Sequence, residues 1–178
     1  MALIVHKHRF VLLHIEKTAG CAMREWLSES VDEYLEQHLT IAQVQELGYW
    51  CPGYEWIGFV RNPYDRLVSW YEMERRDGRQ QTFIEFLDRM RGTIKPQYRY
   101  FNAQMPVRVS IGRYESLSMD FDRLVGQKIN GGLFNGPFLP VVNRSERGDY
   151  RDYYDDQCMD IARHIVEEDC KSFGYAFS

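Results

Sequence analysis

Short apolar runs alternate along the chain with segments in which apolar residues recur every three or four positions. Apolar runs of roughly four to eight residues are typical of buried strands. A recurrence of apolar residues every three or four positions is typical of helices with one buried face. On this basis the sequence predicts strands at 9–15, 55–60 and 108–112, and helices after 20, at 40–47, after 62, and at 82–90, 116–125 and 158–166. Residues 92–106 and 126–140 show no clear period and are predicted as irregular connections.

The order of these elements predicts the fold class. Strands that alternate with helices indicate an α/β protein with a parallel sheet flanked by helices. The chain has 178 residues, a length that suits one domain, so we expect a single domain over residues 1–178. Two of the predicted helices begin with residues that favour a helix start. Thr40 is a good N-cap, and Pro63 fits the first turn of a helix.

Composition narrows the classes of function. The formal net charge of −4 argues against a general nucleic-acid partner, which would need a basic face. Arginine is more frequent than lysine in this sequence, and arginine is the better bidentate partner for phosphate. The four cysteines form no CxxC pair, so no metal is expected. No stretch approaches the roughly 20 apolar residues of a membrane span. We therefore expect a cytoplasmic protein with free thiols and no membrane span.

The segment directly after the first predicted strand is a candidate anion site. It reads His14-Ile-Glu-Lys-Thr-Ala-Gly-Cys-Ala-Met23 and predicts a sharp turn from a strand into a helix. Such a turn aims unpaired backbone N–H groups at one point, where an anion can bind. Gly20 would allow close approach of a phosphate, Thr18 would add a hydroxyl donor, and Lys17 would add a positive charge. The alternative is an ordinary strand–helix turn with a surface lysine.

A second candidate anion site follows the second predicted strand. Arg61 comes directly after that strand, and ligands of open α/β sheets bind at the carboxyl ends of strands. Arg66 and Ser69 are three residues apart and therefore share a helix face. Two guanidinium groups and a hydroxyl would suit a phosphate monoester. The alternative is an ion pair between an arginine and Asp65.

Together these two segments resemble the sulfotransferases that use 3′-phosphoadenosine-5′-phosphosulfate (PAPS), especially the carbohydrate sulfotransferase branch. That family pairs a PKTAGTS-type turn with a downstream FVRNPxxRxxSxY. This chain has EKTAGCA at 16–22 and FVRNPYDRLVSWY at 59–71. Two further stretches are similar to family patterns, the GRYE-L-DF segment within 111–121 and the C-terminal pattern within 143–175. The resemblance therefore covers most of the chain, in order.

The resemblance implies a fold, a donor and a set of residues. It implies a P-loop-like sheet, PAPS as the donor, its bisphosphate PAP as the product, and a small-molecule or carbohydrate acceptor. The 5′-phosphosulfate loop falls on Lys17, Thr18, Ala19, Gly20, Cys21 and Ala22. The 3′-phosphate site falls on Arg61 and Ser69, to which the helix spacing adds Arg66. Three positions depart from the family pattern: Glu16 replaces a proline, and Cys21 and Ala22 replace hydroxyl residues.

Sulfuryl transfer needs a charge partner for the leaving phosphate and a base for the acceptor proton. Lys17 is the expected charge partner. The resemblance points to a histidine in the stretch between the two phosphate segments, which is His38. His14 and Glu16 are the rival bases. Arg144 and Arg147 would either close over the nucleotide or belong to a solvated loop.

Two other classes of function are open at this stage. A non-catalytic PAP-binding or nucleotide-binding protein of the same fold would accommodate the changes at Glu16, Cys21 and Ala22. A P-loop small-molecule kinase would need a glycine-first Walker A loop and a carboxylate for Mg²⁺, and the sequence shows neither.

Overall fold

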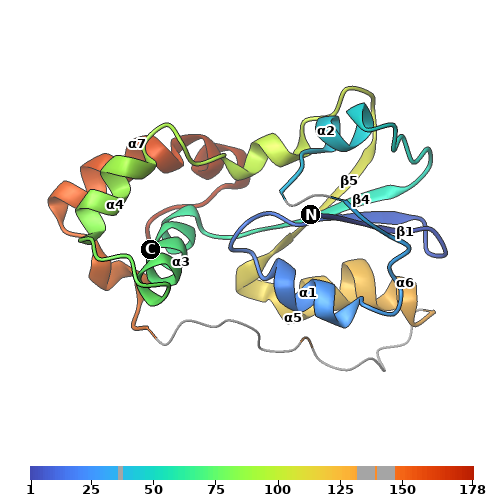
Figure 1. The fold of residues 1–178 in the computed structure, drawn as a ribbon, viewed down its shortest axis with the longest axis horizontal. Helices are drawn as coiled ribbons and strands as arrows, with labels where there is room; N and C mark the ends of the chain where they lie inside the picture. Colours follow the sequence, from blue (N-terminus) through green and yellow to red (C-terminus); the bar gives the residue numbers. More distant parts are fainter. Residues whose placement is uncertain (36–37, 132–138, 140–146) are drawn as a thin grey trace. The chain divides into compact units, whose positions relative to one another are not determined.

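The computed structural model describes residues 1–35, 38–131, 139 and 147–178, which fall into two compact units. The first unit comprises Met1–Val60 and Arg99–Asn143, and the second comprises Arg61–Tyr98 and Arg144–Ser178. Each unit has its own arrangement of elements (Figure 1).

The first unit is built on a five-stranded mixed sheet with the strand order β3-β1-β2-β4-β5. The strands are β1 (Ala2–Val5), β2 (Phe10–Leu13), β3 (Glu33–Tyr34), β4 (Glu55–Val60) and β5 (Arg108–Arg113). β2, β4 and β5 run parallel to one another, as predicted. β1 runs antiparallel to both β2 and β3. The α/β class is therefore confirmed, whereas the prediction of a wholly parallel sheet is wrong.

The antiparallel pairing of β1 with β2 has a simple cause. Only residues 6–9 separate β1 from β2, and a connection that short can join only antiparallel strands. Residues 2–5 form an apolar run of four, which was not predicted as a strand.

Side chains alternate between two apolar layers, one on each face of the sheet. On one face they pack against α1 (Gly20–Trp26), α5 (Leu117–Phe121) and the π-helical turn at 122–126. On the other face they pack against α2 (Ile41–Glu46). Figure 1 shows α1, α5 and α6 (Gln127–Ile129) on the side of the sheet opposite α2. Strands buried on both faces explain the continuous apolar runs of the sequence.

Local signals set the helix ends in this unit. The Thr40 side chain accepts a hydrogen bond from the Gln43 N–H, and the Gln43 side chain accepts one from the Thr40 N–H, a capping box that confirms Thr40 as the N-cap. The helix predicted at 116–125 continues to residue 129. Gly126 does not end it, because its φ of −56° and ψ of −48° are helical. The predicted loop therefore begins later than 126.

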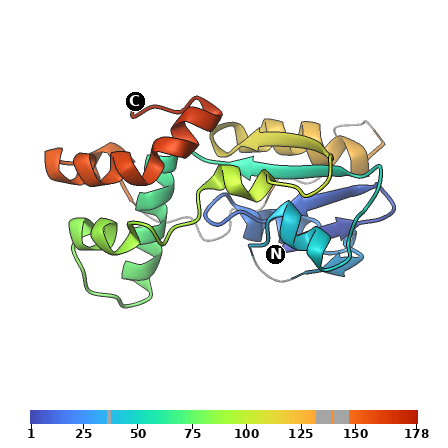
Figure 2. The same cartoon turned by 90° about the horizontal axis from the view of Figure 1, so that it is seen from above.

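The second unit is helical. Its main helices are α3 (Pro63–Arg76), α4 (Phe83–Met90) and α7 (Asp156–Phe173), and Figure 2 shows them packed together. A short 3₁₀ turn lies at Tyr150–Tyr153, and a second one, Gln97–Phe101, spans the point in the sequence where the second unit gives way to the first. Apolar side chains of the three helices form one core. Pro63 takes the first helical position of α3, as predicted. Within the described residues, none of the helices has the length and apolar character needed to cross a bilayer.

Candidate functional site

The turn between β2 and α1 has an unusual backbone. Lys17 has φ of 67° and Ala19 has φ of 68°, so both lie in the left-handed region, whereas Thr18 between them does not. A non-glycine residue there costs roughly 1–2 kcal/mol, and such strain is concentrated at functional sites. Alternating left- and right-handed residues form a nest, whose backbone N–H groups converge on an anion. The two left-handed residues make this turn a candidate for such a site.

Thr18 supports this turn from inside. Its side chain is fully buried, and its Oγ1 donates a hydrogen bond to the Ile15 carbonyl oxygen at 2.9 Å. The hydroxyl proton is therefore engaged within the turn, and a contact from Thr18 to an anion would use its backbone N–H.

Gly20 is required by a neighbouring ring. A Cβ atom added at Gly20 would lie 1.8 Å from Cδ2 of His14, so any larger residue would collide with the imidazole. We expected the glycine for close approach of a phosphate; the structure shows that the missing side chain makes room for His14.

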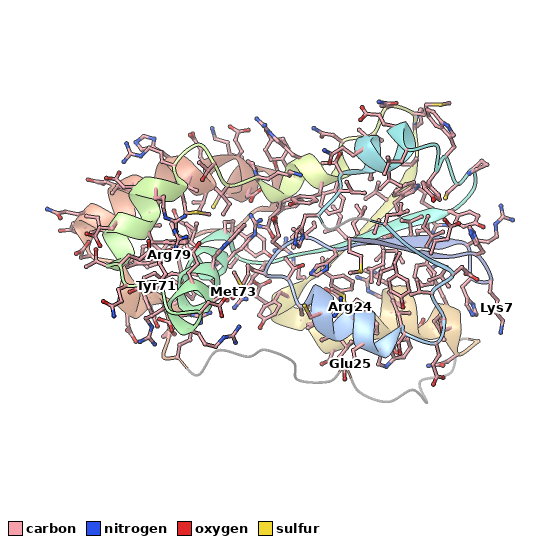
Figure 3. The ribbon with its side chains drawn as sticks, in the orientation of Figure 1. Lys7, Arg24, Glu25, Tyr71, Met73 and Arg79 are labelled. Carbon is pink, nitrogen blue, oxygen red and sulfur yellow. The ribbon has the colours of Figure 1, made fainter. Side chains whose placement is uncertain are left out.

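The first turn of α1 contains Cys21 and Ala22. The Ala22 side chain is buried, and the Cys21 side chain is half-buried. The first N–H groups of a helix have no acceptor within the helix. What Ala19, Cys21 and Ala22 offer a ligand here is therefore backbone N–H groups. Arg24 and Glu25, further along α1, are exposed, and Glu25 lies on the side of α1 away from the sheet (Figure 3).

The structure brings His38 to this turn. Its Nδ1 lies 3.1 Å from the carbonyl oxygen of His14, and the two imidazole rings meet edge to face with centroids 5.0 Å apart. A carbonyl oxygen can only accept, so Nδ1 of His38 carries a proton in this contact. In the neutral ring the lone pair then belongs to Nε2, as a general base requires.

His14 lies in a different environment. It is largely buried, and its Nδ1 has no hydrogen-bond partner among the residues that the structure describes. Burial, with nearby positive charge that includes Arg24, lowers the pKa of His14 from 6.5 to about 3. His14 is therefore neutral near pH 7.

The neutral His14 predicts acid-sensitive stability. In the unfolded chain a histidine binds a proton below about pH 6.5, but in the folded protein His14 stays unprotonated down to about pH 3. Unfolding is therefore favoured as the pH falls through this window. We expect a loss of up to about 1.4 kcal/mol of unfolding free energy per pH unit from this residue.

Urea unfolding between about pH 7 and about pH 5 measures this loss, with His14→Phe as the comparison because it retains a ring but cannot titrate. We expect the wild type to lose more stability than the variant over this range. Equal losses would show that His14 is protonated in the folded state or does not contribute.

Glu16, the rival base, has a partner far away in the sequence. Its carboxylate accepts a hydrogen bond from the hydroxyl of Tyr100, a fully buried side chain. The tyrosine hydroxyl needs an acceptor when buried, which explains a glutamate where the resembling family has a proline. This contact favours a structural role for Glu16.

Arg61 is the first residue of the second unit, and it is almost fully buried. Its Nε donates to Oδ2 of Asp65 at 2.7 Å, and Arg147 donates to the other oxygen of the same carboxylate. The amide of Gln97 bonds both the N–H and the carbonyl of Arg61, each at 2.9 Å. Two guanidinium groups thus share one carboxylate.

Arg66 and Ser69 lie on the buried side of α3. Arg66 is 2% exposed; its Nη1 lies 3.9 Å from Oδ2 of Asp169 and donates to the Lys95 carbonyl oxygen at 3.2 Å. Its guanidinium also lies over the ring of Trp70. These contacts favour a structural role for Arg66. Ser69 is buried as well.

The candidate residues are divided between the two units. Lys17 to Ala22 and His38 belong to the first unit, together with His14 and Glu16. Arg61, Arg66 and Ser69 belong to the second. Arg144 lies outside the described residues, as does the stretch Asn143 to Ser145.

Contacts between residues distant in sequence were not predicted. The acceptor that Glu16 provides for Tyr100 and the clamp of Gln97 on Arg61 are examples. One pairing had a partial signal in the sequence, because Asp65 lies four residues after Arg61 and an ion pair between an arginine and Asp65 was the alternative for this segment.

Comparison with protein-family models, with curated proteins and with solved structures found no match. Among the described residues, no three histidine, cysteine, aspartate or glutamate side chains come together in a way that could hold a metal ion. The function is therefore inferred from the geometry of the site itself.

Proposed function

We propose that this protein is a sulfotransferase that moves a sulfuryl group from PAPS to a hydroxyl or amine of a small-molecule or carbohydrate acceptor. The observation that carries the proposal is the turn between β2 and α1. It has left-handed residues at Lys17 and Ala19, and His38 is held beside it through His14. An anion-binding turn, a lysine and an oriented imidazole are the groups that sulfuryl transfer needs.

The proposed reaction is an in-line displacement at sulfur. The acceptor oxygen or nitrogen forms a bond to sulfur, while the bond from sulfur to the 5′-phosphate oxygen breaks and PAP leaves. Nε2 of His38 takes the acceptor proton. Lys17 and the N–H groups of the turn stabilise the charge that develops on the leaving phosphate oxygen.

The 3′-phosphate is assigned, as the resemblance implies, to Arg61 and Ser69. The cluster of Arg61, Asp65 and Arg147 supports this assignment, because two guanidinium groups meet there and guanidinium is a good bidentate partner for phosphate. Arg66 contributes by holding α3 through its contact with Asp169.

A non-catalytic PAP-binding protein is the second candidate. The observation that favours it is the first turn of α1, where Cys21 and Ala22 provide no hydroxyl donors. Such a protein would keep the nest and the arginine cluster but would not turn over.

Titration calorimetry with three nucleotides tests the proposal. PAP carries both phosphates, adenosine 5′-monophosphate lacks the 3′-phosphate, and adenosine 3′-monophosphate lacks the 5′-phosphate. We expect wild-type protein to bind PAP most tightly. Arg61→Ala should weaken the binding of PAP by about 2 kcal/mol, the contribution of one charge-assisted hydrogen bond. It should leave the binding of adenosine 5′-monophosphate unchanged.

Arg163→Ala is the matched control, because Arg163 is an exposed arginine of the same unit that pairs with Asp160. Normal PAP binding by Arg61→Ala would overturn the 3′-phosphate assignment. ATP binding that requires Mg²⁺, without PAP binding, would favour a kinase. Tight PAP binding without transfer from radiolabelled PAPS to a phenol, a sugar or an amine would favour the non-catalytic protein.

A further inference from the structure

Two histidines from different parts of the first unit form one assembly at the end of β2. The His14 ring occupies the space above Gly20, where no Cβ atom would fit. The His38 ring meets it edge to face, at an interplanar angle of 66°. His38 also has φ of 64°, a left-handed backbone that a residue other than glycine adopts only when its surroundings hold it there.

The His14 backbone provides the second contact. Its carbonyl oxygen accepts from Nδ1 of His38 at 3.1 Å. One residue therefore contacts His38 twice, through the carbonyl oxygen and through the ring. The carbonyl selects which nitrogen carries the proton, and the ring restricts the plane in which the imidazole lies.

We propose that His14 is a positioning residue for His38. Its carbonyl holds His38 in the Nδ1–H tautomer, and its neutral ring fixes the direction in which Nε2 presents its lone pair. The inference deepens the proposed function and rests on it for the identity of the reaction. It also decides between two rival bases, because His14 itself takes no part in proton transfer.

The surroundings of His14 agree with this role. Its own Nδ1 has no partner among the described residues, so the ring is held by packing. Among the residues that the structure describes, the charged and titratable groups that act on it are His38, Arg24 and the amino group of Met1. None of these is a carboxylate that would stabilise a protonated ring, so His14 remains uncharged near pH 7.

Nitrogen NMR of the imidazole rings, on the full chain without nucleotide or acceptor, tests the tautomer directly. We expect His38 to be protonated on Nδ1 in the wild type and in His14→Phe, which keeps a ring above Gly20. His14→Ala keeps the backbone carbonyl but lacks the ring that restricts the plane of His38, so His38 can turn away from the carbonyl and we expect the Nε2–H form to appear as well. His8, which is half-buried in the turn between β1 and β2, serves as the control through His8→Gln, which should leave the His38 signals unchanged.

The kinetic readout uses radiolabelled PAPS and the best acceptor among a phenol, a sugar and an amine. Displacing a catalytic group by about 1 Å can reduce the rate on the order of 100-fold. We expect His14→Ala to lower kcat by at least about tenfold without changing KM for PAPS. His14→Phe should recover most of that loss, and the acid limb of its pH profile should still report one group.

Three results would overturn the inference. The first is an Nε2–H tautomer of His38 in the wild type. The second is His14→Ala with wild-type tautomer and kcat. The third is His14→Phe as inactive as His38→Ala, since His14 would then be the proton acceptor. Absence of transfer to every acceptor, with the expected tautomers, would contradict the proposed function and leave the positioning of His38 by His14 supported.

Discussion

Replacing Asp169 with alanine should lower the free energy of unfolding by about 3–5 kcal/mol, the cost of breaking a buried ion pair. Asp169 is 3% exposed, and its Oδ2 lies 3.9 Å from Nη1 of the buried Arg66. Its two carboxylate oxygens also accept from the backbone N–H groups of Gln97 and Tyr98, at 2.9 and 3.0 Å. In the variant the buried guanidinium group loses its carboxylate partner, and the two backbone N–H groups lose their acceptor.

Urea unfolding followed by circular dichroism measures this loss. Asp160→Ala is the matched control on the same helix, because Asp160 pairs with Arg163 at the surface. We expect the control to change stability by no more than about 0.5 kcal/mol. If Asp169→Ala also loses less than about 1 kcal/mol, the buried network does not stabilise this unit as argued.

The elements that the sequence predicted well are those set by neighbouring residues. Thr40 and Thr82 each form a capping box with the residue three positions later, so both helix starts are specified locally. β4 has six residues, apolar after Glu55, and is buried along its whole length. For these elements the local pattern and the final packing agree.

Sheet order required information that no local pattern contains. β1 has four residues, and its direction is set by the short turn before β2. β3 has only two residues, which pair with Leu3 and Ile4 and form no apolar run. Neither strand is long enough to show a recognisable pattern of apolar residues, so the sequence analysis did not predict the mixed sheet.

The site was predicted in position but not in conformation. The location of the turn after β2 was evident, yet nothing in the letters Lys-Thr-Ala indicates two left-handed residues, because side chains normally disfavour that region. The partner of Glu16 is 84 positions away. The pair of Arg61 and Asp65 was foreseeable, because residues four apart are neighbours on a helix.

Replacing Lys17 with alanine should reduce kcat for sulfuryl transfer by about 100- to 1000-fold, the usual effect of removing one preorganised donor from a developing oxyanion. The affinity for PAP should fall much less, because the backbone N–H groups of the turn remain. This contrast follows from the role assigned to the ammonium group, which acts on charge that appears only in the transition state. Transfer from radiolabelled PAPS and calorimetry with PAP measure the two effects.

The left-handed backbone at Lys17 offers a sharper comparison, Lys17→Gly. Both variants lack the ammonium group, but glycine adopts φ of 67° without the steric cost that alanine retains. Equal losses of kcat in both variants would assign the effect to charge, with the glycine variant the more stable by about 1 kcal/mol. Recovery of kcat in Lys17→Gly would instead make the backbone responsible and would contradict the role of the ammonium group.

Lys7→Ala is the matched lysine control. Lys7 lies in the exposed turn between β1 and β2 (Figure 3), at the opposite end of β2 from the site, so this variant should retain wild-type kcat.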